Sequence, residues 1–339
     1  MDFRKVIRSH DWWTSKIAPF SAVGYATIFI SEATLLTAVL WILYILLSLM
    51  AGATYVSLLN DLTDMDCDVK AGKKELLPTR VVARRWAMLI VSVMLGLVCM
   101  FFLYRDLLSF LLYLAPWIIF YLYSVPPVRL KERGVWGVLA DAAGAHFFPG
   151  CVMVSSVSHF LHHQINISWF LAVGAWGLAL GVRGILWHQL RDRETDLHSG
   201  LNTFIVTLSP GKLKKVIMIV LLLEVLSLMV MLFIIKSLII LLFLFLYLLF
   251  VLVRYKVRGT RLTIVASAED DNYRMVMTEY YEIFFPVSLL LNFSLHQPGA
   301  WVVLILHLLL FYRYYLDTFR WVFRQVRVSA ISVMSGAFK

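Results

Sequence analysis

The sequence predicts an all-α fold, a polytopic bundle of nine or ten transmembrane helices around a central cavity that opens to the cytosolic side. The chain has 339 residues, 61% hydrophobic and 15% charged, whereas an average soluble domain has about 45–50% apolar and about 25% charged residues. Apolar runs long enough to cross a bilayer recur along its length. Lysines and arginines concentrate in alternate connections between those runs. We therefore expect one membrane-embedded domain over residues 1–339, with the lipid bilayer as a partner.

Ten segments have the length and hydropathy of a membrane span, which needs about 17–25 mostly apolar residues. They are Ile17–Thr34, Leu36–Leu59, Trp86–Tyr104, Leu107–Tyr123, Val135–Val157, Trp169–Leu190, Val216–Ile235, Leu238–Val253, Ile283–Leu295 and Trp301–Tyr315. The ninth segment is short and could merge with its neighbour, so nine spans remain an alternative.

The basic residues predict the orientation of these spans, because positively charged connections favour the cytoplasmic side. With a cytoplasmic N-terminus, the outer connections contain only Arg105 and Lys236 as basic residues. The C-terminus is then cytoplasmic as well, and the long polar stretches 60–85, 124–134, 191–215 and 254–280 all face the cytosol. The net charge of +10 follows this topology, so we expect no nucleic-acid partner.

An acidic motif follows the second span. Asn60, Asp64 and Asp68 are spaced four residues apart, so on a helix they share one face, with Asp61 beside them. Asp66 points elsewhere. A row of like charges on one helix face repels itself unless a cation compensates it. The motif therefore predicts a cation site.

The same motif returns after the sixth span. The spacing Asp-x-x-x-Asp-x-x-x-Gly occurs at Asp64, Asp68 and Gly72 and again, 128 residues later, at Asp192, Asp196 and Gly200. His188 takes the place of Asn60 in the second copy. This repetition predicts an internal repeat with halves at about 1–134 and 135–255, followed by the C-terminal spans and a basic tail in 256–339. Both copies end spans of the same orientation, so four carboxylates can converge on one cavity.

Carboxylate and amide oxygens suit Mg²⁺, which prefers oxygen ligands and binds together with substrate phosphates. The predicted metal ligands are Asn60, Asp61, Asp64, Asp68, Asp192 and Asp196. Four of them, Asp64, Asp68, Asp192 and Asp196, are also the predicted catalytic residues. We therefore expect Mg²⁺ to hold a diphosphate between the two motifs. In a membrane protein, an isoprenyl diphosphate fits this site because its tail can lie among the spans.

These residues resemble the UbiA-type intramembrane prenyltransferases over most of the chain, from His10 to about residue 255. The first motif matches that family's Asn-Asp-x-x-Asp-x-x-x-Asp at residues 60–68, and the second matches its Asp-x-x-x-Asp at residues 192–196. The segment from Tyr123 to Lys131, Tyr-Ser-Val-Pro-Pro-Val-Arg-Leu-Lys, looks like the Tyr-Ser-x-Pro-Pro segment in the branch that contains chlorophyll synthase. A tenth span and the basic tail after Tyr315 depart from the family's usual nine spans.

The resemblance implies that Mg²⁺ assists the loss of diphosphate from an allylic prenyl donor, and that the resulting cation then alkylates an acceptor, which we expect to be an aromatic or other lipophilic compound. Physical chemistry agrees, because metal ions and basic residues stabilise a leaving diphosphate where its charge develops. An apolar cavity keeps water from an allylic cation, and aromatic faces can support that cation.

Four basic residues are candidates for binding the diphosphate: Lys73, Arg129, Lys131 and Arg183. Arg129 and Lys131 reach it if the Tyr-Ser-x-Pro-Pro loop folds over the site, but as loop charges they also satisfy the topology rule alone. Arg183 lies inside the sixth span, where an ionisable side chain is a functional candidate. The alternative for Arg183 is a salt bridge to an interior acid.

Tyr123, Asp141 and His188 are candidates for the acceptor site. Asp141 and His146 interrupt the fifth span, where polar side chains should face a cavity or a partner helix. They would then bind or deprotonate the acceptor, or form an interhelix hydrogen bond. By contrast, Asp66 and Glu194 lie about 200° around the helix from the preceding motif aspartate and should be dispensable.

Four other functions compete with prenyl transfer. A terpene cyclase of the same family would close the prenyl cation on its own chain, and a related transferase would move a phosphoribosyl group onto a polyprenyl phosphate. A secondary transporter also carries intramembrane acids and repeats, although nearer the bilayer midplane. The spacing of Asp64, Asp66, Asp68 and Glu75 suggests a calcium loop, but Val69 occupies the position where that loop needs glycine.

Overall fold

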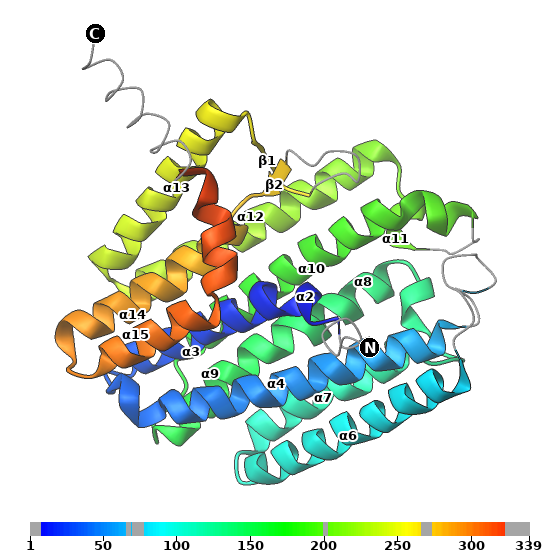
Figure 1. Ribbon diagram of the computed structural model, residues 1–339, viewed down its shortest axis with the longest axis horizontal. Coiled ribbons are helices and arrows are strands. Elements are labelled where there is room, and N and C mark those ends of the chain that lie inside the picture. Colours follow the sequence, from blue (N-terminus) through cyan, green and yellow to red (C-terminus); the bar gives the residue numbers. More distant parts are fainter. Residues whose placement is uncertain (1–7, 66–68, 70–77, 199–202, 266–272, 323–339) are drawn as a thin grey trace, which may run out of the picture.

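The computed structural model describes residues 8–65, 69, 78–198, 203–265 and 273–322 as a bundle of long helices that lie roughly side by side (Figure 1). The first helix has three consecutive pieces, α2 (Ser9–Trp12), the π-helix η1 (Trp13–Ile17) and α3 (Ala18–Ile30). Then follow α4 (Leu35–Thr63), α6 (Thr79–Leu103), α7 (Leu107–Ser124) and the 3-10 helix η2 (Leu130–Glu132). The next helix comprises α8 (Val135–Ala142), the π-helix η3 (Ala143–Phe147) and α9 (Phe148–Phe160).

The second part of the chain has the same helical character. Its elements are α10 (Ile167–His198), α11 (Phe204–Thr207), α12 (Pro210–Ile235), α13 (Leu238–Arg258), strands β1 (Arg261–Thr263) and β2 (Tyr273–Met275), the π-helix η4 (Tyr280–Phe284), α14 (Phe285–His296) and α15 (Ala300–Leu310). A last helix, Tyr312–Val322, is bent by 75° from α15. The two strands pair in parallel, with Arg261 opposite Tyr273, so the prediction of a purely α fold missed this short sheet.

The outer surface of the bundle is apolar. Large side chains such as Leu40, Phe233 and Leu238 expose 75%, 74% and 84% of their surface. A continuous apolar surface of this kind is unfavourable in water and is expected where lipid surrounds the helices. The protein is therefore a multi-pass integral membrane protein.

Within the described residues, seven helices are long and apolar enough to cross a membrane, or eight if the bent pair after Gly299 counts as one span. The sequence predicted nine or ten. The difference lies in the first and ninth predicted segments, which correspond to α3 and to η4 with α14. These helices are buried in the centre of the bundle, with polar residues such as Thr27, Ser288 and Asn292 inside it. The pieces α3 and α14 are only 13 and 12 residues long, shorter than the about 17–25 residues of a span, and the π-helices that precede them add the charged residues Lys16 and Glu282.

In the described part of the chain, three π-helices interrupt the helices that surround the centre, and a proline follows each one, at Pro19, Pro149 and Pro286. Proline has no backbone N–H, so it removes the helical hydrogen bond to the residue four positions earlier. A π-turn inserts one residue and re-aims the side chains around it. Lys16, His146 and Glu282 lie in these three turns, and all of them line the cavity described below.

Helix α10 approaches the α8–η3 helix closely because small residues lie at the contact. A Cβ atom on Gly181 would lie 2.7 Å from the Cα atom of Ala142, which is closer than real Cβ atoms come. Glycine at this position lets two helix backbones approach. The close contact holds the helix that ends in the second acidic motif against the helix that carries Asp141 and His146.

Candidate active site

A cavity of about 1160 Å³ lies in the centre of the bundle, and both acidic motifs border it. The C-terminal ends of α4 and α10, which carry the motifs, lie at the same end of the molecule (Figure 1). Ten of the predicted site residues line this cavity: Asn60, Asp61, Asp64, Tyr123, Arg129, Lys131, Asp141, His188, Asp192 and Asp196. The structure thus brings together residues that are as much as 136 positions apart in the sequence, from 60 to 196.

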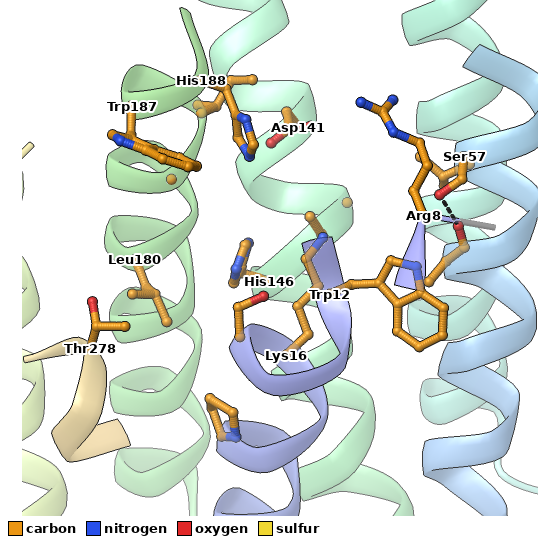
Figure 2. A pocket seen from close by; sticks show the side chains of 18 of the residues that line it. Arg8, Trp12, Lys16, Ser57, Asp141, His146, Leu180, Trp187, His188 and Thr278 are labelled. Carbon is orange, nitrogen blue, oxygen red and sulfur yellow. Dashed lines mark hydrogen bonds between the residues drawn. The ribbon is translucent and has the colours of Figure 1, made fainter. Parts of the chain in front are cut away.

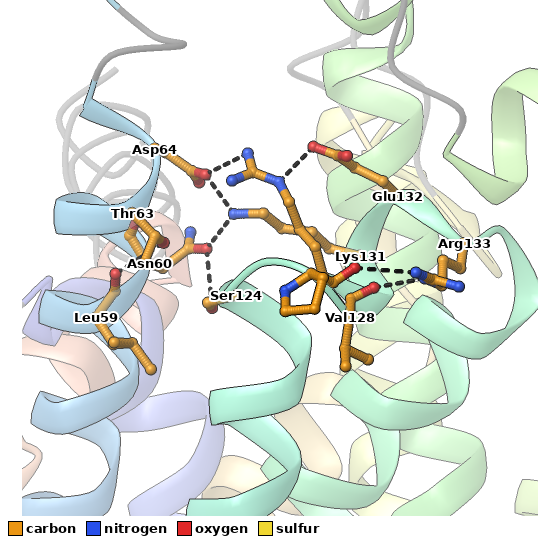
Figure 3. Close-up of polar contacts among 11 residues, drawn as sticks. Leu59, Asn60, Thr63, Asp64, Ser124, Val128, Lys131, Glu132 and Arg133 are labelled. Atoms are coloured by element: carbon orange, nitrogen blue, oxygen red, sulfur yellow. Dashed lines mark hydrogen bonds and ion pairs between the residues drawn. The ribbon is translucent and has the colours of Figure 1, made fainter.

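The loop after α7 contacts the first acidic motif directly (Figure 3). Lys131 Nζ donates to Asn60 Oδ1 at 2.9 Å and also pairs with Asp64 Oδ1. Arg129 Nη2 lies 3.0 Å from the same Asp64 oxygen, and Ser124 Oγ lies 3.4 Å from Asn60 Oδ1. The loop therefore folds over the motif, as the sequence required for a site role of Arg129 and Lys131.

The backbone of this loop holds its two basic side chains in place. Arg129 has φ 41°, in the left-handed region that residues other than glycine adopt at a cost. Its Nε pairs with Glu132, which turns the guanidinium toward Asp64. Only 14% of the Lys131 side chain is exposed, and this burial lowers the pKa of Lys131 below its usual value, although Asp64 opposes the shift.

Asp61 has two arginine neighbours that the sequence did not single out. Arg85, at the beginning of α6, places Nη1 3.4 Å from Asp61 Oδ2, and Arg8 places Nη1 4.0 Å from Oδ1. The sequence gives neither arginine a site role, because helical periodicity within α4 carries no information about which neighbouring helix faces Asp61. Among the described residues, the negative charge of the first acidic motif is thus compensated by four basic side chains, those of Arg8, Arg85, Arg129 and Lys131.

The second motif lies across the cavity on α10. Asp196 is buried, whereas the Asp192 side chain is 54% exposed and lies 3.8 Å from Arg191 Nε. Glu194, between them, is exposed and does not line the cavity, as its helical position predicts. One helix face of α10 therefore presents Asp192 and Asp196 toward the first motif.

Polar side chains continue from the motifs into the interior of the cavity (Figure 2). Asp141 and His146 come from the α8–η3 helix, His188 from α10 and Lys16 from η1. His146 Nδ1 is buried and has no hydrogen-bond partner among the residues that the structure describes. Of the two interpretations of the interrupted fifth span, this geometry favours a polar cavity wall over an interhelix hydrogen bond for His146.

Arg183 is not part of the cavity, contrary to one of the predictions. Its side chain is fully buried, Nη2 donates to Glu224 Oε1 at 2.9 Å, and Nε lies 2.6 Å from Glu224 Oε2. It also donates to the backbone oxygens of Ile264 and Val276. Nine residues separate Arg183 from Asp192, and at about 100° per residue they point to opposite sides of α10. The interior salt bridge was the correct alternative.

Two predicted site residues, Asp68 and Lys73, lie outside the described residues, as do Asp66, Gly72, Glu75 and Gly200. Among the described side chains, no three histidine, cysteine, aspartate or glutamate residues form a group that could hold a metal alone. Mg²⁺ nevertheless fits the donors that are present, because it commonly binds one or two carboxylates and completes its shell with water and substrate phosphates. Asp61 and Asp64 on one wall and Asp192 and Asp196 on the other are such donors.

Comparison with known proteins gives a family and a fold. Residues 17–264 match the model of the UbiA prenyltransferase family. Three solved structures of a UbiA homologue from Archaeoglobus fulgidus, bound to Cd²⁺, to GPP and Mg²⁺, and to DMAPP and Mg²⁺, are 19%, 18% and 18% identical to this chain, with TM-scores of 0.55, 0.54 and 0.53. Each alignment covers 87% of this chain and 98% or 99% of the homologue. No curated protein matches the sequence.

Proposed function

The chain belongs to the UbiA prenyltransferase family of enzymes, and from this premise we propose that it transfers a prenyl group from an isoprenyl diphosphate to a lipophilic, aromatic acceptor. The observation that carries the proposal is the meeting of two acidic motifs and a basic loop at one cavity. The UbiA homologue whose structures hold GPP or DMAPP together with Mg²⁺ supports the same donor class and the same metal.

In the proposed site, Mg²⁺ would be held by Asn60, Asp61, Asp64, Asp68, Asp192 and Asp196. When bound, the metal neutralises the charge that develops on the leaving diphosphate. Arg129 and Lys131, already in contact with Asp64, donate hydrogen bonds to the diphosphate oxygens. Lys73, which lies outside the described residues, is the third candidate for this role. The C–O bond of the donor breaks with both electrons on the diphosphate. An electron pair of the acceptor then forms the new bond, and the acceptor loses a proton.

The prenyl tail lies, in this proposal, along the apolar part of the cavity. Aromatic residues line it there, among them Phe20, Tyr55, Trp117 and Phe120. The rings of Tyr55 and Trp117 pack with centroids 4.7 Å apart, which gives a dense wall. Such a wall excludes water and presents π faces to an allylic cation. Tyr123, Asp141 and His188 bind the acceptor near the polar end, with His146 beside them.

We also propose the finer topology of the protein. The two central helices, η1–α3 and η4–α14, cross the membrane with the seven or eight apolar ones, which gives nine or ten spans. Both termini and the mouth of the cavity face the cytosol, because the basic connections concentrate there.

Identification of products tests the reaction. Purified protein is incubated with Mg²⁺ and geranyl diphosphate, with and without a panel of phenols, and products are analysed by mass spectrometry. We expect diphosphate release that depends on Mg²⁺ and an acceptor that gains one prenyl group. A cyclic hydrocarbon or cyclic alcohol formed without acceptor would instead identify a cyclase. If no diphosphate were released, neither the transferase nor the cyclase function would hold.

The depressed pKa of Lys131 predicts a pH dependence. Only the protonated amine of Lys131 stabilises the negative charge on the leaving diphosphate. A lowered pKa means that this amine loses its proton at a lower pH than an exposed lysine does. Donor kcat/KM should therefore fall on the alkaline side as pH rises through this pKa. In Lys131→Arg the guanidinium stays charged at much higher pH, so the alkaline decline should move upward even if activity is lower. An identical alkaline limb in both proteins would exclude Lys131 as the titrating group.

A further inference from the structure

A second polar cluster lines the cavity on the wall built by the C-terminal helices. Arg254, near the end of α13, pairs with Glu279 just before η4, and its Cζ atom lies 5.0 Å from the Phe250 ring centroid. Trp321, in the last helix, packs on the same Phe250 ring at 5.7 Å. Arg254, Glu279 and Trp321 all line the cavity that the acidic motifs border. Most of this cluster lies beyond residue 264, where the match to the family ends.

The cluster has polar atoms that nothing in the described part of the chain satisfies. Arg254 Nη2, Thr278 Oγ1, Glu279 Oε2 and Trp321 Nε1 are buried and have no hydrogen-bond partner there. Arg254, Glu279 and Trp321 are only 5%, 3% and 9% exposed. Buried polar groups are nearly always paired, because an unpaired one loses its hydration without compensation. These atoms therefore point to a polar group that enters from the cavity.

The unpaired atoms also indicate what that group is. Two are N–H donors, one is a carboxylate acceptor, and the Thr278 hydroxyl can do either. A hydroxyl satisfies such a set, since it donates to Glu279 and accepts from Arg254 or Trp321. The rings of Tyr281, Tyr314 and Trp321 line the same wall and provide apolar faces for an aromatic ring.

Charge on this wall disfavours an anion. The positive charge of Arg254 is already balanced by its ion pair with Glu279. Glu282, also buried, lies next along the wall and accepts a hydrogen bond from the Tyr314 hydroxyl. Arg258 and Arg274 also line the cavity, but both are exposed, so solvent screens their charge. A carboxylate placed at the cluster would therefore meet two acidic side chains and no uncompensated buried cation.

We propose that this cluster, formed by Arg254, Thr278, Glu279 and Trp321, binds the ring hydroxyl of the acceptor, and that the acceptor is a neutral hydroxylated aromatic compound. The inference rests on the proposed transferase function and specifies its acceptor site. Figure 2 shows Thr278 in the same pocket as Asp141 and His146, so an acceptor held by the cluster remains within the reacting cavity.

Binding of two matched phenols tests the charge argument. Methyl 4-hydroxybenzoate and 4-hydroxybenzoate share a ring and a hydroxyl but differ in charge. The full-length protein would be titrated with each by calorimetry in the presence of Mg²⁺ and inorganic diphosphate, so that no prenyl transfer occurs during the measurement. We expect the neutral ester to bind about tenfold more tightly, a difference of about 1.4 kcal/mol. Equal binding, a preference for the carboxylate, or no measurable binding of the ester would overturn the proposal.

Two variants test the residues. In Trp321→Phe the ring remains and the N–H is lost, so the Kd of the ester should rise roughly fivefold, as expected for one neutral hydrogen bond. In Glu279→Gln it should rise about tenfold or more, because a charged acceptor is lost. Trp301→Phe, on the outer surface of α15, is the matched control and should bind the ester as the parent does. If Glu279→Gln does not fold, the Kd of the ester for Trp321→Phe is sufficient to test the proposal, and an unchanged Kd would contradict it.

Donor binding separates this inference from the function on which it rests. Geranyl diphosphate with Mg²⁺ should bind equally to the parent, Trp321→Phe and Glu279→Gln. If the parent does not bind or cleave the donor, the proposed function fails. If the donor is bound and cleaved but both variants retain the parent's affinity for the ester, the acceptor site is elsewhere.

Discussion

Asp64→Ala and Asp192→Ala should each lower Mg²⁺-dependent release of diphosphate from geranyl diphosphate by roughly 10²-fold or more, while the protein remains folded. The two aspartates lie on opposite walls of one cavity, so neither motif can replace the other. Asp64→Ala also leaves Arg129 and Lys131 without their carboxylate partner. Asp192 is half exposed, and among the described residues its one ion pair is with Arg191 at 3.8 Å, so its removal should hardly affect stability.

Glu194→Ala is the control for Asp192→Ala. Glu194 is two residues away on the same helix, has the same charge and does not line the cavity. Its removal should leave diphosphate release unchanged. Release would be measured under saturating Mg²⁺, and thermal unfolding would be recorded for all three variants. Normal turnover in both aspartate variants would exclude the proposed site, and a similar loss in Glu194→Ala would show that the helical register is wrong.

The sequence was sufficient to predict that the described residues of both acidic motifs border one cavity, because helical periodicity is a local rule. Asp192 and Asp196 are four residues apart, so they share a face wherever α10 packs. The convergence of two such helices followed from the repeat and from their common orientation. The same local rule identified Glu194 as facing away from the cavity.

What the sequence did not predict depends on contacts between helices. Nothing near Asp61 in the sequence indicates that Arg85, on the next helix, lies against it. The polar wall at Arg254 and Glu279 consists of residues 25 positions apart that have no repeat or motif to connect them. The number of spans was uncertain for a related reason, since α3 and α14 are packed inside the bundle, have only 13 and 12 residues, and each follow a π-helix that carries a charged side chain.

Arg183→Met should lower the free energy of unfolding by about 3–5 kcal/mol, because it leaves the carboxylate of Glu224 buried without its cation. Both side chains are completely buried, so water cannot replace the lost partner. Tyr281 still donates to Glu224 at 2.9 Å, but one hydroxyl does not balance a charge. The double variant Arg183→Met/Glu224→Gln removes both charges, and it should recover most of the lost stability.

Arg320→Met provides the comparison at the surface. Arg320 and Asp317 form an ion pair at 3.8 Å with both side chains 69% exposed, so this change should cost less than about 1 kcal/mol. Unfolding would be followed by denaturant titration in mixed micelles, together with binding of geranyl diphosphate. Arg183→Met should keep the parent's donor affinity once folded, because Arg183 does not line the cavity. If instead it lost donor affinity and was no less stable than Arg320→Met, Arg183 would be a diphosphate ligand and the salt bridge would not be its main role.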